Sequence, residues 1–408
     1  MKGIFLFLLF IFNFNVQAES FNELLLRLNE HDLLKSAIEK ASSLEENARS
    51  LGSWGDPNVS IAALNFPADS LKQNESMMTG IQFSLSQKIS LSGKYGAIEE
   101  SQLAAARGQI NEVSHLKRTF IKKLWELSIF NEKLINEHKV LLENYDWIDN
   151  NLKVTKRLYS TGKVPQQAVL DIQIRKSELK TQIDQNSFTQ ESLKYQFRVL
   201  LNSKDNIELD LSSVPWKLLD DWKRGNEDND YKEKSLKSNV ENYGFKLSAH
   251  KKDLFPDLTL GFSYTKRNDI DGVGDFVGVK ISFPIPTSSK KYATKNEMAY
   301  LKAEAERKYR HYQNIKPNLL NIIESEIEDA NNRLETLQKE SLRYSKSSRD
   351  ITAKSYSRGG AEYLELLRAE LQYQEQRMKE ISLIAVLKER KVNYLFLKGS
   401  LLALGGEL

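Results

Sequence analysis

The residues best suited to chemistry lie in a stretch rich in glycine and aspartate, in the second half of the chain. Residues 269–275 (DIDGVGD) partly resemble a calcium-binding loop, whose carboxylates would supply the oxygen ligands that Ca²⁺ prefers. The last ligand position of such a loop should be acidic, and here it is Lys280. The overlapping residues 272–278 (GVGDFVG) lack the glycine spacing of a dinucleotide-binding loop, and no βαβ pattern surrounds them. We interpret the stretch as an exposed hairpin loop, with calcium binding as the less favoured alternative.

Other side chains that could hold a metal or attack a substrate are few and scattered. The chain has no cysteine, which excludes disulfides, zinc–thiolate sites, cysteine nucleophiles and a lipid-modified N-terminal cysteine. The five histidines share no ligand spacing. They are His31, His115, His138, His250 and His311. Acidic residues interleave with lysines along the helical stretches, as on solvated faces. We therefore expect no catalytic residue, no cofactor, no metal site and no enzyme activity.

The first eighteen residues have the pattern of a secretory signal peptide. Lys2 precedes an apolar run at residues 4–12, and the small residue Ala18 closes the segment. The run is shorter than the ~20 residues of a spanning helix, so a membrane anchor is the less favoured alternative. We expect cleavage after Ala18 and a mature protein in a bacterial periplasm or outer membrane. The net charge is only +4 without a basic block, so we expect no nucleic-acid partner.

Three pairs of segments repeat about two hundred residues apart, which indicates an internal duplication. The first pair is residues 157–171 (RLYSTGKVPQQAVLD) and 354–368 (KSYSRGGAEYLELLR). The other two pairs begin at Asp56 and Phe255, and at Gly80 and Phe276. Each half has the same order: a strand-like run, a loop, a second strand-like run, a long helix pattern, a glycine turn and another long helix pattern.

Four short runs alternate apolar and polar residues, as β-strands do. They cover residues 58–66, 80–91, 256–266 and 276–286. Their length matches the ~9–11 residues of a transmembrane strand, and an apolar face opposite a polar face is typical of a membrane barrel. Four strands of a small soluble sheet are the alternative that the pattern leaves open.

The long helix patterns carry apolar residues at intervals of seven, which predicts coiled-coil packing. One row is Val113, Phe120, Leu127, Leu134, Leu141 and Ile148. A second is Ile323, Ala330, Leu337, Tyr344 and Ile351, beside Leu320, Ile327 and Leu334, and a third is Leu364, Leu371, Met378, Ala385 and Val392. Gly162 and Gly359 interrupt these patterns, and glycine supplies the left-handed backbone that ends a helix. We therefore predict two helical hairpins, with tips at 159–164 and 356–361 and with the strands at their opposite ends.

The strands predict an oligomer if they lie in a membrane. The smallest transmembrane barrels have eight strands, so one chain cannot close a barrel. An open sheet in lipid would leave unpaired backbone groups at its edges, which is very costly. Several copies must then share one barrel: two would give eight strands and three would give twelve. This argument does not fix the number.

The whole-chain order of these motifs resembles that of the TolC-like outer-membrane efflux proteins, the outer membrane factors. The resemblance covers essentially the whole mature chain. It rests on the turns at 159–162 and 356–359, on Pro57 and Pro256 at the start of strands, and on residues 283–286 (FPIP), where a strand leads into a helix. Residues 55–70 (GDPNVSIAALNFPADS) look most like the heavy-metal cation efflux branch of that family.

The resemblance implies a mainly α protein with membrane β-structure, assembled as a homotrimer. Twelve strands would form one outer-membrane β-barrel, and the helices would form an α-helical barrel in the periplasm of a Gram-negative bacterium. Such proteins are passive exit ducts, and they dock on a periplasmic adaptor and an inner-membrane pump, here expected to be of the resistance-nodulation-division type. The cargo stays open among metal cations, drugs and polypeptides. A soluble periplasmic coiled-coil scaffold or adaptor is the alternative function.

The resemblance also implies roles for parts of the chain. The repeats would span 19–202 and 254–398, and residues 203–253 with the tail 399–408 would form an equatorial belt. The adaptor would contact the tips. The expected contact residues are Tyr159, Gly162, Lys163, Val164, Tyr356, Gly359, Gly360 and Ala361.

In this family a tyrosine, an arginine and an aspartate near the tips often hold the periplasmic mouth closed. Tyr356 matches the tyrosine, but Ala361 and Ala168 occupy the arginine and aspartate positions. Arg358 and Asp171 lie nearby in the sequence and are the candidate substitutes. For Tyr356, packing at a helix end is an equally favoured interpretation.

Overall fold

The computed structural model describes residues 18–223, 229–268, 270–287 and 289–403. The chain divides into two compact units. Unit 1 combines Met1–Leu34, His115–Asp230 and Lys316–Leu408, and unit 2 combines Lys35–Ser114 and Tyr231–Ile315. The predicted signal peptide, except Ala18, and the end of the predicted tail lie outside the described residues.

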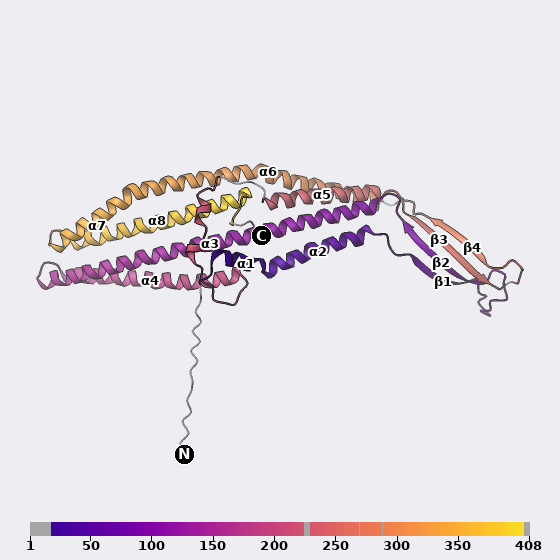
Figure 1. The fold of residues 1–408 in the computed structure, drawn as a ribbon, viewed down its shortest axis with the longest axis horizontal. Coiled ribbons are helices and arrows are strands. Elements are labelled where there is room, and N and C mark those ends of the chain that lie inside the picture. The colour runs from indigo at the N-terminus through magenta and orange to yellow at the C-terminus, as the bar shows by residue number, and fades with distance from the viewer. Residues whose placement is uncertain (1–17, 224–228, 269, 288, 404–408) are drawn as a thin grey trace, which may run out of the picture. The chain divides into compact units, whose positions relative to one another are not determined.

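The element order confirms the duplicated architecture, mainly α with one antiparallel sheet (Figure 1). In the first half, β1 (Asn58–Leu64) and β2 (Gly80–Ile89) lead into α3 (Lys94–Ser160) and α4 (Gln166–Leu200). In the second half, β3 (Leu258–Arg267) and β4 (Phe276–Ser282) lead into α6 (Lys290–Thr336), the π-helical turn η3 (Leu337–Ser341), α7 (Leu342–Ser357) and α8 (Tyr363–Lys398). The remaining elements are α1 (Phe21–Asn29), α2 (Asp32–Gly52), the 3₁₀ turns η1 (Leu211–Ser213) and η2 (Trp216–Leu219), and α5 (Tyr231–Lys252).

The heptad row predicted for the first hairpin is confirmed where α3 lies in unit 1. Helix α3 has 67 residues, about 100 Å at 1.5 Å per residue. Four residues of the row are buried: Leu127, Leu134, Leu141 and Ile148. In α8 the corresponding row is only partly correct, because Val392 is buried while Leu364 and Leu371 are exposed.

The heptad row predicted for the second hairpin is wrong beyond the π-helical turn η3. Ala330 before the turn and Leu337 at its first position are buried as expected, but Tyr344 and Ile351 after it are 59% and 68% exposed. Ser345, one residue later than predicted, is buried instead. A π turn holds one extra residue in the helical ladder, so the inward face continues one position further along the sequence.

The segment predicted as an equatorial belt contains a helix that the sequence analysis did not predict. Residues 231–252 form α5 and belong to unit 2. The part before α5 is irregular and lies in unit 1, where Leu209 forms a parallel bridge with Glu19. No helix within the described residues is long and apolar enough to cross a membrane.

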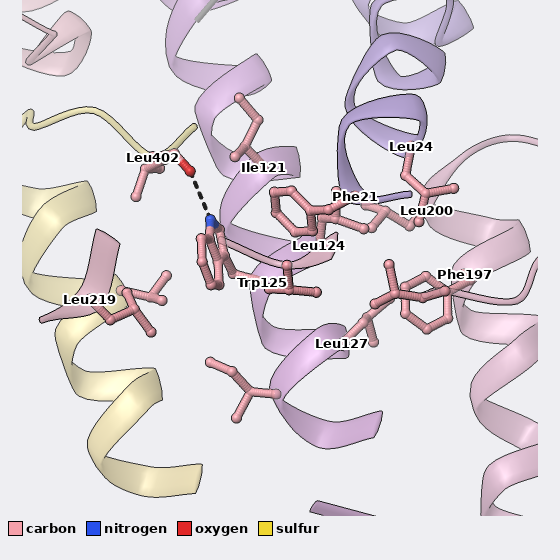
Figure 2. Packing of buried hydrophobic residues seen from close by; sticks show 14 of the residues in the cluster. Phe21, Leu24, Ile121, Leu124, Trp125, Leu127, Phe197, Leu200, Leu219 and Leu402 are labelled. Atoms are coloured by element: carbon pink, nitrogen blue, oxygen red, sulfur yellow. Dashed lines mark hydrogen bonds between the residues drawn. The ribbon is translucent and has the colours of Figure 1, made fainter. Parts of the chain in front are cut away.

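The main core of unit 1 gathers segments far apart in the sequence around Trp125 of α3 (Figure 2). The indole is fully buried, and its ring centroid lies 5.0 Å from that of Phe21 in α1. Its Nε1–H donates a hydrogen bond of 2.8 Å to the carbonyl of Leu402 near the C-terminus. Arg118 binds the same terminal segment by donating to the carbonyl of Ser400 at 2.8 Å. These contacts hold α1 and residues 400–402 against the middle of α3.

Trp125→Phe is expected to lower the free energy of unfolding by about 1–3 kcal/mol, because the carbonyl of Leu402 would stay buried without its donor. Denaturant unfolding of the full-length protein measures the change. Hydrogen exchange should show the loss at residues 395–403 first. Trp216→Phe serves as the control, since its partly buried indole donates only a longer bond of 3.3 Å to the carbonyl of Leu211 in the neighbouring turn η1.

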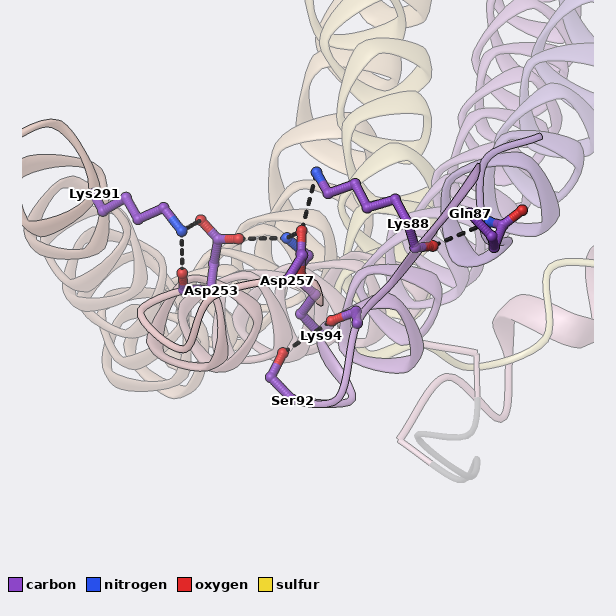
Figure 3. A network of polar contacts seen from close by, with 8 residues as sticks. Gln87, Lys88, Ser92, Lys94, Asp253, Asp257 and Lys291 are labelled. Atoms are coloured by element: carbon purple, nitrogen blue, oxygen red, sulfur yellow. Dashed lines mark hydrogen bonds and ion pairs between the residues drawn. The ribbon is translucent and has the colours of Figure 1, made fainter. Parts of the chain in front are cut away.

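In unit 2, a network of charges ties the end of the sheet to the helices beside it (Figure 3). Lys94, the first residue of α3, donates to Asp253 at 2.5 Å and to Asp257 at 2.7 Å. Lys88 of β2 lies 3.0 Å from Asp257, and Lys291 of α6 lies 3.3 Å from Asp253. Burial is the largest single effect and raises the pKa of both aspartates, but the hydrogen bonds and charges of the surrounding lysines together outweigh it, so each pKa lies below its usual value.

The network predicts a pH window for the contribution of Lys94 to stability. The lowered pKa of the two aspartates makes their contribution present above the unfolded-state value, about 3.9, and lost as the pH falls through the folded pKa. Burial lowers the pKa of Lys94 but its bonds to the aspartates raise it further, so its contribution is lost only at strongly alkaline pH. The stability difference between wild type and Lys94→Met should therefore be constant from about pH 5 to 9 and shrink below it. A difference that persists at pH 2 would contradict this.

Candidate functional sites on the sheet and at the hairpin tips

The sheet of unit 2 has strand order β1-β2-β3-β4, with all neighbours antiparallel. Its register fixes which residues share a face, because directly paired residues point the same way. One cross-strand row is Val59, Leu85, Phe262 and Val279, and the next is Ile61, Phe83, Tyr264 and Val277. These eight side chains form the apolar face. The alternate rows carry Ser60, Ser84, Ser263 and Gly278, and Asn58, Ser86, Gly261 and Lys280, which form the polar face.

The apolar face is open in the single chain. Val277 is 80% exposed, Val59 is 72% exposed and Phe262 is 58% exposed. A water-soluble sheet would bury such a face against a helix or a second sheet. Strands β1 and β4 each have one neighbour among the described strands, so both edges of the sheet are also unpaired. The sheet thus lacks a partner both for one face and for two edges.

The loop between β3 and β4 is organised by Arg267, whose side chain is 1% exposed. Its guanidinium pairs with Asp271 at 3.0 Å and donates to the carbonyl of Gly274 at 2.9 Å. Asp275 accepts from the backbone N–H of Arg267 at 2.9 Å and pairs with Lys266 at 3.1 Å. Both described carboxylates of the candidate calcium loop are therefore bound by cations of the chain itself. Asp269 lies outside the described residues.

The two hairpin tips of unit 1 end their helices in the same way. After α3, Gly162 has φ +71° and donates to the carbonyl of Tyr159, and Lys163 donates to the carbonyl of Leu158, both at 2.9 Å. After α7, Gly359 has φ +81° and donates to the carbonyl of Tyr356 at 2.9 Å, while Gly360 donates to that of Ser355 at 3.0 Å. Each is a Schellman motif, which requires a left-handed residue and favours glycine. The sequence match therefore reflects one local structure.

The two tips lie against each other. A Cβ added to Gly359 would lie 3.9 Å from Cδ of Lys163. Val164 of the first tip and Ala361 of the second pack against one hydrophobic cluster, which includes Ile148, Ile172 and Leu366. Of the other six predicted contact residues, five are exposed, namely Tyr159, Gly162, Lys163, Gly359 and Gly360, and Tyr356 is buried.

The matching tyrosines of the two tips differ in burial. Tyr159 is 46% exposed, whereas Tyr356 is fully buried. The hydroxyl of Thr155 in α3 donates to the carbonyl of Asn151, so it accepts from the Tyr356 hydroxyl 2.9 Å away. Burial raises the pKa of Tyr356. In this structure Tyr356 packs at a helix end and joins α7 to α3.

The other predicted mouth residues do not form a lock within the chain. Asp171 accepts from Gln167 at 2.7 Å and also binds Tyr363, whose pKa is raised by burial and by this carboxylate. No ion pair joins Asp171 to Arg358 among the described residues, and Arg358 is exposed. Ala168 is fully buried in the hairpin.

The strongest polar link between the hairpins was not predicted. The guanidinium of Arg175 in α4 donates two hydrogen bonds to the carboxylate of Glu370 in α8, from Nε to Oε2 at 3.0 Å and from Nη2 to Oε1 at 3.3 Å. Glu370 is fully buried and Arg175 is 6% exposed. Burial raises the pKa of Glu370 although Arg175 opposes the shift. Gln374 extends the link by accepting from Arg175 and donating to Gln182 at 3.1 Å.

A sequence signal for this pair existed. Leu366, Glu370 and Tyr373 follow the i, i+4, i+7 spacing of a buried helical stripe, and all three are buried. An acidic residue inside such a stripe requires a cationic partner. The sequence could not tell which arginine supplies it, because Arg175 lies on another helix.

Neither a scan against protein-family models nor a search of curated proteins finds a match to this chain. Solved structures do match. The outer membrane protein VceC from Vibrio cholerae has a TM-score of 0.77 at 11% identity, covering 94% of this chain and 97% of that one. The outer-membrane channel OprN has a TM-score of 0.77 at 15% identity, covering 94% and 90%. The Campylobacter jejuni CmeC outer membrane channel has 0.72 at 15% identity, covering 93% and 86%.

These similarities extend over nearly the whole of each chain, while the identities are too low to favour any branch. They agree with the duplicated strand pairs and helical hairpins expected from the sequence. The chain has the fold of bacterial outer-membrane channel proteins.

Proposed function

We propose that the chain is the protomer of a homotrimeric exit duct in the outer membrane of a Gram-negative bacterium. The observation that carries the proposal is the sheet with an exposed apolar face and two unpaired edges. Lipid would cover the apolar face as it covers the outside of a membrane barrel. Strand β4 of one copy would pair with β1 of the next, so that no backbone group stays unpaired in lipid.

Three copies would give a barrel of twelve strands, the number that the resemblance to TolC-like proteins implies. The polar face would line the lumen. The helices would continue the duct into the periplasm. The tip residues named above would contact a periplasmic adaptor, except Tyr356, whose side chain is fully buried within the chain. An inner-membrane pump, of the resistance-nodulation-division type, would drive transport, and the duct itself would be passive and not an enzyme. Residues 55–70 resemble the heavy-metal cation branch, but the cargo stays open among metal cations, drugs and polypeptides.

The test of the proposed function is the mass and location of the protein. We expect the full-length protein to fractionate with the outer membrane, to sediment in detergent as a trimer and to form channels in a planar bilayer. Release with the soluble periplasm, or a monomer without channel activity, would favour the coiled-coil scaffold instead.

Tyr356→Ala is expected to raise single-channel conductance, because it removes the buried ring and the hydroxyl contact that join α7 to α3 near the mouth. Tyr159→Ala is the matched control, since it removes the same side chain from an exposed position in the other tip. Conductance that is equal in both variants and wild type, in a folded trimer, would place the closure of the mouth elsewhere.

A further inference from the structure

The charges of the four strands all have one sign. None of the strands contains an aspartate or a glutamate, although the chain has 55 acidic residues. The strands contain four cationic residues, Lys88 of β2, Lys266 and Arg267 of β3, and Lys280 of β4. Pores often select ions by lining their walls with side chains of one charge sign.

The register divides these cations between the two faces. Lys280 pairs with Gly261, which in turn pairs with Ser86, so Lys280 belongs to the polar face. Lys88 and Arg267 are separated from Ser86 and Gly261 by even numbers of residues, so they share this face. Lys266 alone lies on the apolar face, where it pairs with Asp275 at the end of the strand.

Of the three cations on the polar face, Lys280 differs from the other two because no acidic residue is found to pair with it among the described residues. Lys88 is bound by Asp257 and Arg267 by Asp271. Lys280 is exposed, and no ion pair to it is found among the described residues. Its neighbours across the strands are small: a Cβ added to Gly261 would lie 3.6 Å from the Cβ atoms of both Lys280 and Ser86. Nothing bulky covers the lysine on that side.

We infer that the barrel wall favours anions, with Lys280 as the residue that determines the preference. The inference rests on the proposed function, because the polar face lines a lumen only in the closed oligomer. Three copies would place three Lys280 ammonium groups around one lumen. Rings of lysine or arginine favour anions in pores, and the field of each charge extends about 8 Å in physiological salt. A small anionic solute, or an anionic form of a drug, then passes this wall more readily than a bare metal cation.

The acidic residues near the sheet lie in its loops and in the adjoining helix ends. Asp271 and Asp275 are bound to Arg267 and Lys266. Glu75, in the loop between β1 and β2, pairs with Lys72 at 3.6 Å. At the other end of the sheet, Asp253 and Asp257 face the three lysines of the network in Figure 3. These five acids thus have cationic partners. Asp56 and Asp69 have no ion pair among the described residues, but both lie in loops outside the strands, so the strands themselves carry only positive charge.

The test is the reversal potential of the full-length wild-type protein in a planar bilayer under a KCl gradient. We expect chloride to be more permeant than potassium. Lys280→Glu should lower the chloride-to-potassium permeability ratio by about threefold or more near 0.1 M salt, and less at 1 M, where the Debye length is ~3 Å. Lys280→Gln should lie between them. Lys266→Gln, which removes the same charge from the apolar face, should match wild type.

The outcomes separate this inference from the proposed function. Channels that open normally but prefer potassium, or an anion preference that Lys280→Glu leaves unchanged, would overturn the inference and leave the duct intact. Absence of any channel from the folded wild-type protein would overturn the duct itself. If Lys266→Gln changed the permeability ratio as much as Lys280→Gln, the polar face identified from the strand register would not be the face that lines the lumen.

Discussion

Arg175→Met is expected to lower the free energy of unfolding of the paired hairpins by about 3–5 kcal/mol, because it leaves the fully buried carboxylate of Glu370 without its cation. Hydrogen exchange of the full-length protein measures the local effect in α4 and α8. Thermal unfolding in detergent measures the global effect. A loss below about 1 kcal/mol would mean that water reaches Glu370 and that the pair is not a buried link.

The double variant Arg175→Met/Glu370→Leu is the matched control. Replacing both members of a buried pair by apolar residues is often nearly neutral, so the double variant should recover most of the loss. Recovery would show that the loss of stability in Arg175→Met comes from the buried, unpaired carboxylate of Glu370. A double variant as unstable as Arg175→Met would show that the methionine itself packs badly.

Acid should partly rescue Arg175→Met. Burial already raises the pKa of Glu370, and loss of the arginine removes the opposing effect. A carboxyl with a raised folded pKa binds a proton more readily in the folded state, so the folded state gains stability as the pH falls through that pKa. The gain should end near the unfolded value, about 4.3. Arg175→Met/Glu370→Leu should show no such rescue.

In the proposed barrel, Phe262→Arg is expected to destabilise the sheet by about 2–4 kcal/mol, because it would place a cationic side chain on the face proposed to contact lipid near mid-membrane. Phe262 belongs to a central strand, and its exposed ring lies in the middle of the apolar face. We expect fewer folded trimers in the outer membrane and a lower midpoint for unfolding by urea in lipid vesicles.

The adjacent residue provides the control for Phe262→Arg. Ser263 lies on the same strand but on the polar face, opposite Ser84 and Gly278. Ser263→Arg should therefore assemble almost as well as wild type, since its side chain would reach water in the lumen. Equal damage from both variants would contradict the assignment of one face to lipid and the other to water.

The sheet could be predicted well because a strand pattern has a period of two and needs no knowledge of the partner strand. Period-two alternation alone placed Phe83 and Leu85 on one face and Ser84 and Ser86 on the other. The tips were predictable for a similar reason: Gly162 and Gly359 perform a local backbone task that glycine does best.

Packing between helices was harder to predict. Tyr159 and Tyr356 match in the sequence, yet only Tyr356 is buried, because burial depends on whether a neighbouring helix covers the position. The Arg175–Glu370 pair likewise depends on the relative rotation of α4 and α8. Helix α5 was missed because its polar sequence has no marked apolar stripe, and tertiary contacts such as that of Ser235 with Glu112 support it instead.

The π-helical turn η3 also bears on how the two halves of the gene diverged. Lys94 and Lys290 open the two long helical stretches, and Ser160 and Ser357 close them, so the second stretch is one residue longer than the first. One inserted codon in a continuous coiled coil would rotate every later side chain by ~100° about the helix axis. The π-helical turn at Leu337–Ser341 accommodates the extra residue, because a π turn holds one more residue than an α-helical turn. Downstream, Tyr356 and Gly359 form the same glycine turn as Tyr159 and Gly162 of the first half, so the extra residue is accommodated without loss of the tip.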